Sequence, residues 1–321
     1  EILLFGATGQ IGRNLIRKLS QNNYKITAVT RNIHRAGYIL KTQANPGYLE
    51  IVEITNFDPE RIENLISKCD ICINLIGILF EKKINQFKNI HTNLPDLLSQ
   101  KAQKFNLDKF IHLSSLGIEK AVDSNYAISK LEGEKKIKKN FKNSIILKPS
   151  IVYSVDDKFT TRFMTLLSRL PFMPIYYNGN TKFSPICCSD LTDTIFHIIS
   201  NNIYSKIIEC VGPEIITFKE ILERLLKLID KKRILIPFPL PIAKFSAKIF
   251  EIMPKPILTI DQLNLLKYDN IPSGKYKTNS DIGLPSKLYF KDEVKKYSYM
   301  WRDGGEFSTE KYNFRDIEKK S

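Results

Sequence analysis

The segment Ile2-Leu3-Leu4-Phe5-Gly6-Ala7-Thr8-Gly9-Gln10-Ile11-Gly12 decides the fold class of this chain. Its four leading apolar residues predict a buried strand, and the glycines predict a tight turn that opens a helix. A turn without Cβ atoms lets backbone N–H groups approach a pyrophosphate, which the positive end of the helix then holds. Strand, glycine turn and helix in this order favour a dinucleotide site over a turn needed for packing alone. We expect the cofactor contacts to come from Gly6, Thr8, Gly9, Gln10, Ile11 and Gly12.

Short β-rich runs alternate with helical patterns over the first 148 residues, which is typical of βαβ units. After Pro149 the pattern changes to segments interrupted by proline. The sequence therefore predicts an α/β fold, a doubly wound parallel sheet with a smaller mixed C-terminal region. We expect a nucleotide-binding domain at 1–148, a closing or docking region at 149–303 that partly returns to the first domain, and a polar tail at 304–321. The expected strands are residues 2–5, 25–30, 49–54, 70–75, 110–114 and 144–148.

Composition excludes several classes of protein. Of the 321 residues, 43% are apolar and 26% are charged, which is typical of a globular chain and not of a disordered or fibrous one. Lys and Arg number 49 against 34 Asp and Glu, for a net charge of +15. Such an excess favours an anionic partner such as a lipid headgroup or a phosphorylated cofactor, with a general bias towards Lys as the alternative. We expect no nucleic acid partner.

Neither a membrane span nor a metal site is predicted. The longest uncharged apolar stretches, residues 71–80 and 234–243, are shorter than the roughly 20 residues that cross a bilayer. Cys69 and Cys72 form a CxxC pair inside a buried-strand pattern, without the second pair that a metal site needs. The four His residues are scattered, and an odd number of Cys favours reduced thiols.

The end of the second predicted strand indicates which nucleotide is preferred. NAD-binding units carry an acidic residue there, which accepts hydrogen bonds from the ribose 2′-hydroxyl. Here the strand ends Val29-Thr30-Arg31-Asn32, with Arg35 one helical turn later. A guanidinium can pair with a 2′-phosphate, so Arg31 and Arg35 favour NADP(H) over NAD(H), which stays possible. The plain alternative is that both arginines are solvated surface residues without a nucleotide contact.

Candidate catalytic residues follow the later strands. Asn74 and Gly77 lie at the end of the fourth strand and Ser115 lies just after the fifth, at the edge where open α/β sheets bind ligands. Tyr126 and Lys130 share one face of a predicted helix, because they are four residues apart. We expect the ammonium to lower the pKa of the phenol and make Tyr126 a usable acid or base. The plain alternative is a core-edge Tyr beside a surface Lys.

The glycine turn, Asn74-Leu75-Ile76-Gly77, the serines at 114 and 115 and the Tyr126–Lys130 pair, in this order, resemble the short-chain dehydrogenase/reductase superfamily in its extended or atypical branch. More specifically, the chain resembles the nucleotide-binding accessory subunits of respiratory complex I, the NADH:ubiquinone oxidoreductase, over about residues 1–268. The motifs that carry this closer resemblance are Asn74 to Gly77, Phe87 with Ile90-His91, Lys109 to Ser114, Lys148-Pro149-Ser150 and Pro237-Phe238-Pro239-Leu240-Pro241.

The resemblance implies tight NADPH binding, a structural or assembly role, and a peripheral position among complex I subunits near the membrane. That position is the inner face of a respiratory membrane, on the bacterial cytoplasmic or the mitochondrial matrix side. The cofactor positions of the family match Gly6, Gly9, Gly12 and Arg31. The superfamily's catalytic pair matches Tyr126 and Lys130, and Ser115 is the third candidate catalytic residue. Two alternatives stay open: a free-standing oxidoreductase or epimerase, and a regulator that senses NADP(H).

The stretch after residue 234 predicts a docking element. The proline-rich hinge at 237–241 precedes a helical pattern with Ile242, Phe245, Ile249 and Ile252 on one face and lysines on the other. Apolar and basic residues are typical of a docking surface, whereas an enzyme lid needs polar substrate contacts. Packing of this face on its own domain, or on lipid, is the alternative.

Overall fold

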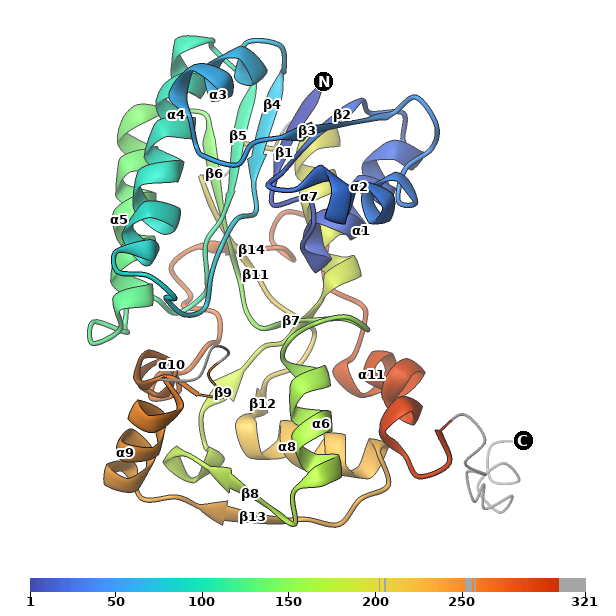
Figure 1. Cartoon of the computed structure of the whole chain (residues 1–321), viewed down its shortest axis with the longest axis vertical. Coiled ribbons are helices and arrows are strands. Elements are labelled where there is room, and N and C mark those ends of the chain that lie inside the picture. Colours follow the sequence, from blue (N-terminus) through green and yellow to red (C-terminus); the bar gives the residue numbers. More distant parts are fainter. Residues whose placement is uncertain (202, 205, 252–255, 257, 306–321) are drawn as a thin grey trace.

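A parallel eight-stranded sheet organises the chain in the computed structural model (Figure 1), which describes residues 1–201, 203–204, 206–251, 256 and 258–305. The six predicted strands are confirmed, each within a residue of its expected ends, and two more strands from the C-terminal half extend the sheet. In spatial order the sheet runs β14, β11, β6, β5, β4, β1, β2, β3. The strands are β1 (Ile2–Phe5), β2 (Ile26–Thr30), β3 (Leu49–Glu53), β4 (Ile71–Asn74), β5 (Lys109–Leu113), β6 (Ser144–Pro149), β11 (Ile207–Cys210) and β14 (Lys277–Thr278).

Helices cover both faces of the sheet (Figure 1), which confirms the doubly wound α/β class. Buried apolar residues of α1 and α7 pack on one face, and those of α3, α4 and α5 on the other. The strands are apolar on both faces because both faces are covered. The helices are α1 (Gln10–Gln21), α2 (Ile33–Lys41), α3 (Pro59–Ile66), α4 (Leu94–Lys104), α5 (Asn125–Asn140) and α7 (Cys188–Ser200), with a π-helical turn η1 (Lys88–Asn93) before α4.

The strand order reverses between β1 and β4. β1 pairs with β2 on one side and with β4 on the other, so that Phe5 lies opposite Val29 and Asn74. Connections therefore leave the carboxyl ends of β1 and β4 towards opposite faces of the sheet, which is where open α/β sheets bind their ligands. The glycine turn and the residues after β4 both lie at this edge.

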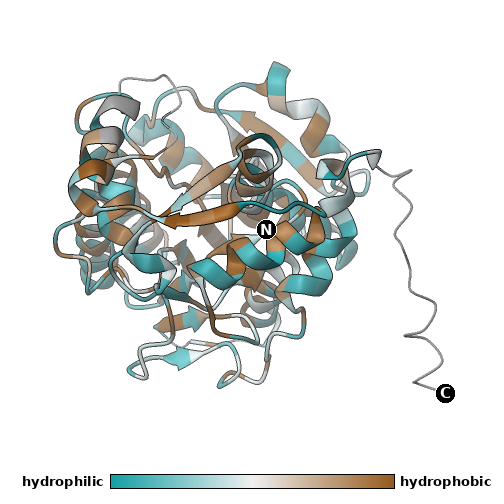
Figure 2. Ribbon diagram, turned by 90° about the horizontal axis from the view of Figure 1, so that it is seen from below, coloured by the Kyte–Doolittle hydropathy of each residue, from teal (hydrophilic) through white to brown (hydrophobic). Residues whose placement is uncertain are grey.

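A smaller part of the chain packs below the sheet (Figure 1) around a second apolar core. Seen from below, its helices carry both hydrophobic and hydrophilic residues (Figure 2), as amphipathic helices do. Its elements are β7 (Val152–Tyr153), α6 (Thr160–Arg169), β8 (Phe172–Ile175), η2 (Tyr177–Gly179), β9 (Lys182–Phe183), β10 (Ile186–Cys187), β12 (Ile216–Thr217), α8 (Phe218–Leu228), β13 (Ile234–Pro237), α9 (Leu240–Phe250), α10 (Ile260–Leu265), α11 (Phe290–Ser298) and η3 (Tyr299–Trp301).

The described residues contain no helix with both the length and the apolar character that a bilayer span requires. The expected polar tail lies outside the described residues from position 306 onward, as does Ile252 of the expected docking helix.

Candidate functional site

The glycine turn after β1 depends on two glycines for different reasons. Gly6 has φ +83°, a backbone conformation that favours glycine, and a Cβ there would lie 2.9 Å from the carbonyl carbon of Leu75. Gly12 lies inside α1, where a Cβ would lie 2.5 Å from the carbonyl oxygen of Gly6 and 2.7 Å from Cα of Ala7. Gly12 therefore lets the first turn of α1 approach the turn after β1, as a dinucleotide site requires.

The N-terminus of α1 is open to an anion. Gly9 is the N-cap residue in an extended conformation, and no described side chain caps the first turn. Thr8 and Gly9 are exposed, whereas Ile11 is partly buried against the core. Gln10 binds the C-terminal half instead: its Nε2 donates to the Val152 carbonyl at 3.2 Å. The backbone N–H groups of this turn thus fit a pyrophosphate.

The two arginines predicted to select the nucleotide lie on the surface beside this turn. Arg31 and Arg35 are exposed, and among the described residues neither guanidinium forms an ion pair. The second strand carries no acidic residue at its end, but the neighbouring strand does, because Glu53 ends β3 opposite Thr30. The Glu53 carboxylate accepts a hydrogen bond from the Ile33 amide at 2.6 Å. The signal available in the sequence was a carboxylate at the end of the neighbouring strand.

Tyr126, Lys130 and Ser115 lie together, as the sequence predicted. Ser115 lies near enough to the Tyr126 hydroxyl to lower its pKa, and Nζ of Lys130 lies 5.7 Å from the centre of the Tyr126 ring. Nζ also donates to the Leu113 carbonyl at 3.0 Å. This arrangement can in principle hold a proton between a phenol and a hydroxyl beside a cation.

The expected lowering of the Tyr126 pKa is wrong. Burial raises the pKa of Tyr126 to about 12, although the Ser115 hydrogen bond opposes the rise. Burial also lowers the pKa of Lys130 to about 8, with Glu134 acting in the opposite direction. The reason is that burial disfavours the charged form of both groups, so Lys130 loses its charge at a lower pH than the one at which Tyr126 ionises.

Asn74 and Gly77 shape the segment that follows β4. The Asn74 amide contacts Nδ1 of His112 at 3.2 Å, and its oxygen accepts from the Ile76 amide at 3.1 Å. A Cβ at Gly77 would lie 3.6 Å from Nζ of Lys130. The structure therefore brings the end of β4 directly against the Lys130 ammonium.

His91, one of the four histidines scattered along the sequence, lies beside this site. Its Nε2 accepts from the Ile78 amide at 3.1 Å, so its Nδ1 carries the proton and donates to the Ser129 hydroxyl at 3.0 Å. Burial, with Lys130 as a second cause, lowers the pKa of His91 to about 2. A neutral His91 therefore ties the segment after β4 to α5, and spacing along the sequence could not reveal it.

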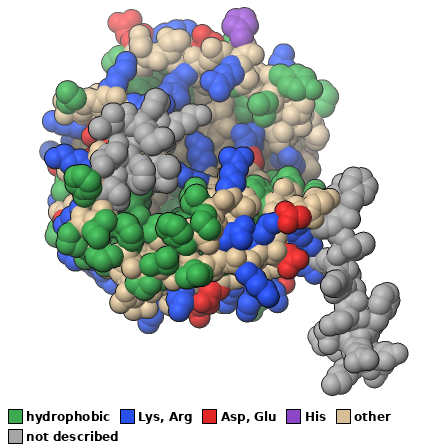
Figure 3. All heavy atoms as spheres, turned by 60° about the horizontal axis from the view of Figure 1, so that its bottom comes forward, with side chains coloured by type: hydrophobic (Ala, Val, Ile, Leu, Met, Phe, Trp, Pro, Cys, Tyr) green, Lys and Arg blue, Asp and Glu red, His purple; other side chains and the backbone are tan. Residues whose placement is uncertain are grey.

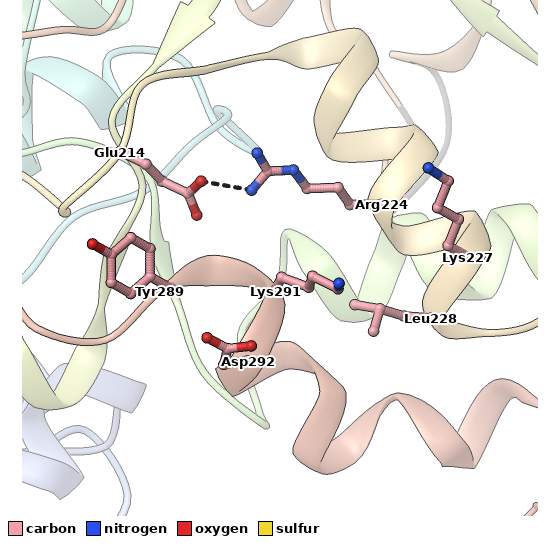
Figure 4. A pocket seen from close by; sticks show the side chains of 7 residues that line it. All are labelled: Glu214, Arg224, Lys227, Leu228, Tyr289, Lys291 and Asp292. Carbon is pink, nitrogen blue, oxygen red and sulfur yellow. Dashed lines mark hydrogen bonds and ion pairs between the residues drawn. The ribbon is translucent and has the colours of Figure 1, made fainter. Parts of the chain in front are cut away.

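A pocket of about 380 Å³ lies elsewhere, in the C-terminal region between α8 and α11 (Figure 4). Two of its charged side chains compensate each other, because Arg224 forms an ion pair with Glu214 at 2.7 Å. Within the described ranges, no group of three or more His, Cys, Asp or Glu is arranged to hold a metal ion. The pocket is lined by Glu214, Arg224, Lys227, Leu228, Tyr289, Lys291 and Asp292.

The chain is similar to curated subunits of mitochondrial complex I. A Dictyostelium discoideum protein named NADH dehydrogenase (ubiquinone) 1 alpha subcomplex subunit 9 is 29% identical over 70% of this chain and 62% of its own length. An Arabidopsis thaliana protein of that name is 25% identical over 94% of this chain and 78% of its own length. The NADH-ubiquinone oxidoreductase 40 kDa subunit of Neurospora crassa is 24% identical over 88% of this chain and 74% of its own length. The chain thus spans less than two thirds of the Dictyostelium relative.

Solved structures share the fold. The dTDP-glucose 4,6-dehydratase DesIV from Streptomyces venezuelae, solved with NAD bound, superposes with a TM-score of 0.70 at 14% identity, over 94% of this chain and 96% of that one. UDP-glucose 4-epimerase from Thermotoga maritima superposes with a TM-score of 0.66 at 15% identity, over 94% of this chain and 99% of that one. Residues 2–201 also match the model of the NAD dependent epimerase/dehydratase family, which is more than half of the chain. With its glycine turn and Tyr126–Lys130 pair in place, the chain belongs to the NAD dependent epimerase/dehydratase family.

Proposed function

We propose that this protein is an NADP(H)-binding accessory or assembly subunit of respiratory complex I, in which the nucleotide is mainly structural. The names of the curated relatives support the partner complex. The observation that carries the proposal is an exposed apolar surface on the C-terminal region, at the opposite end of the molecule from β3 and α3 (Figure 1).

This apolar surface is formed by the exposed faces of β8, β13 and α9. β13 pairs with β8, so that Ile234 lies opposite Phe172, and α9 follows β13 directly. Hydrophobic side chains gather over this end of the molecule (Figure 3). Monomeric proteins rarely leave such a surface uncovered. It comprises Phe172, Ile234, Ile236, Leu240, Ile242 and Phe245.

The exposure of α9 supports the docking face that the sequence predicts. Among the side chains of α9 that the structure describes, Ala243 and Ala247 are buried, whereas Ile242 is 51% exposed and Phe245 is 67% exposed. Much of the surface of these two large residues is uncovered, which supports docking rather than packing on their own domain. Lys244 and Lys248 flank them and are also exposed. A surface of this kind suits a hydrophobic partner beside anionic lipid.

The structural role of the nucleotide rests on the surroundings of Tyr126. Its ring is only 8% exposed and packs with Phe87, Ile118 and Ala127, and Leu265 and Tyr268 of the C-terminal region pack against this cluster. The chain's own apolar side chains thus occupy the space around the phenol. A nucleotide bound to the folded state stabilises that state and so supports docking.

Replacement of Phe245 by Asp tests this proposal. Phe245→Asp should release the protein from its membrane complex, while the melting temperature and nucleotide affinity stay unchanged, because an exposed residue contributes little to folding. Val122→Asp is the matched control, since Val122 is 72% exposed on the nucleotide-binding part. Fractionation of native membranes in mild detergent measures the release. A Phe245→Asp protein that stays folded and fully associated would refute the proposal.

A second candidate function is a free-standing oxidoreductase or epimerase. The observation in its favour is the assembled group of Ser115, Tyr126 and Lys130, which retains the hydroxyl contact and the nearby ammonium. In that case Tyr126 would donate or accept the proton, and the nicotinamide would supply the hydride chemistry.

A further inference from the structure

Asp261 links the C-terminal region to the first turn of α5. Its Oδ1 accepts a hydrogen bond from the Asn125 amide at 2.6 Å. Its Oδ2 accepts from the Ser124 hydroxyl at 2.9 Å and from the Tyr126 amide at 3.3 Å. These donors are the N-cap residue and the first two residues of α5, more than 130 positions earlier in the chain.

The carboxylate satisfies donors that the helix cannot satisfy by itself. The Ser124 hydroxyl caps only the Ala127 amide, at 3.2 Å. The amides of Asn125 and Tyr126 have no acceptor within the helix, because the first N–H groups of any α-helix lack one. Asp261 supplies both acceptors and places a negative charge at the positive end of the helix.

Asp261 is itself held in place. α10 begins with a capping box between Thr259 and Gln262, and the Ile260 amide donates to the Glu251 carboxylate at 2.8 Å. On the same helix Leu265 packs against the Tyr126 cluster. The carboxylate is therefore presented to α5 by a fixed helix and not by a loose loop.

The position of the reactive pair depends on this contact. Tyr126 is the second residue of α5 and Lys130 lies one turn further, so a shift of the first turn moves the hydroxyl directly and the ammonium with it. At the other end of the site, the glycine turn and Arg31 belong to β1, α1 and the end of β2, and Asp261 forms no hydrogen bond with them in the described residues. The two halves of the site are thus held by different contacts.

We propose that Asp261 is a positioning residue for the nicotinamide half of the nucleotide site, acting through the first turn of α5. The inference rests on the proposed function, because it presupposes nucleotide binding. It assigns the C-terminal region a role in cofactor geometry in addition to docking. Asp261 does not itself contact the reacting atoms.

Two ligands separate positioning from general stability. NADPH uses both halves of the site, whereas adenosine 2′,5′-bisphosphate carries only the adenosine half. In calorimetric titrations of the full chain, Asp261→Ala should weaken NADPH binding by about tenfold, because a small misplacement of a binding group is costly. The same change should leave the affinity for adenosine 2′,5′-bisphosphate unaltered.

A neighbouring ion pair provides the control. Asp123 pairs with Lys267 at 3.5 Å and joins the same two parts of the chain on the surface, so Asp123→Asn should change neither affinity. Asp261→Asn keeps an acceptor for the Asn125 amide and should lose less NADPH affinity than Asp261→Ala. If the Ala variant fails to fold, the two titrations are carried out on the Asn variant instead. Equal losses for both ligands, or no loss for either, would overturn the inference. An unmodified protein that binds neither ligand would overturn the proposed function and this inference with it.

Discussion

Nζ of Lys148, at the end of β6, lies 2.9 Å from a carboxylate oxygen of Glu134 on α5, and both side chains are at most 2% exposed. The Glu134 carboxylate also accepts from the Ser114 hydroxyl at 2.6 Å, and Lys148 forms a second ion pair with Glu119. Ser114 therefore faces this buried pair and not Tyr126. The pair anchors α5 to the sheet one helical turn beyond Lys130.

Removal of the Glu134 charge should strongly destabilise the fold. We expect Glu134→Gln to lower the free energy of unfolding by about 3–5 kcal/mol, because Lys148 then loses its buried partner and, among the described residues, keeps the half-exposed Glu119 as its ion-pair partner. Glu132→Gln, at an exposed position of the same helix, is the control and should change stability by less than about 0.5 kcal/mol. Urea denaturation at pH 7 measures both. Equal stabilities for the two variants would contradict this assignment.

His91 should make the protein sensitive to mild acid. Its pKa is about 2 in the folded protein, well below the ordinary value of 6.5, so between these values only the unfolded chain binds the proton. The contribution of His91 to the free energy of unfolding is therefore fully present above pH 6.5. It decreases as the pH falls, and the decrease reaches about 2 kcal/mol at pH 5.

The His91→Asn variant isolates that contribution. It should be less stable than the unmodified protein at pH 7, because hydrogen bonds are lost, but should lose less further stability between pH 7 and pH 5. His112, whose pKa is also lowered by burial, contributes in the same direction to both proteins and does not affect the comparison. Denaturation curves at the two pH values provide the test, and identical pH dependence would exclude His91 as the acid-sensitive group.

Gly12 and Gly37 should respond oppositely to alanine. A Cβ at Gly12 would lie 2.5 Å from the Gly6 carbonyl oxygen, so Gly12→Ala should destabilise by about 1–3 kcal/mol and abolish measurable nucleotide binding. Gly37 in α2 has only a side-chain atom of Ile33 nearby, at 3.4 Å. Gly37→Ala should be neutral or stabilising by up to about 1 kcal/mol, because alanine favours helices. Thermal melts with and without NADPH compare them, and a tolerated Gly12→Ala would argue against the close turn.

Arg31 should select the nucleotide. The unmodified protein should bind NADPH more tightly than NADH, because an exposed guanidinium without an ion-pair partner among the described residues can pair with the 2′-phosphate. Arg31→Asp should reverse the preference, whereas Arg61→Asp makes the same charge change at an exposed site on α3 and should not. Calorimetry measures both affinities. Equal or tighter NADH binding by the unmodified protein would refute NADP(H) selectivity.

Tyr126→Phe should distinguish a structural from a catalytic role. The change removes one hydroxyl beside Ser115, so nucleotide affinity and assembly into the complex should remain nearly unchanged. Lys130→Ala should weaken nucleotide binding more, since it removes a buried ammonium beside Gly77. Binding and assembly assays test this outcome. Loss of a reductase or epimerase activity in the Phe variant, with assembly intact, would favour the enzyme.

Local features of the fold followed from the sequence alone. The six strands lie where short-range patterns predicted them, and local sequence also explains the N-cap at Asp58 before Pro59 and the capping box of Thr217 and Glu220. Hydrophobic periodicity, caps and glycine turns act between residues a few positions apart, so the information is contained in each segment. The approach of Tyr126 and Lys130 was predictable for the same reason, since a single helix turn separates them.

The tertiary structure decided the chemistry of the site. The pKa of Tyr126 depends on desolvation by Phe87, Leu265 and Tyr268, which come from distant parts of the chain. The contacts of His91 with Ser129 and of Asp261 with α5 join residues 38 and more than 130 positions apart. No pattern in the sequence encodes these distances, because burial and long-range hydrogen bonds arise only when the helices pack. The sequence by itself determined the nucleotide-binding architecture, and the packing determined how its acid, base and helix termini behave.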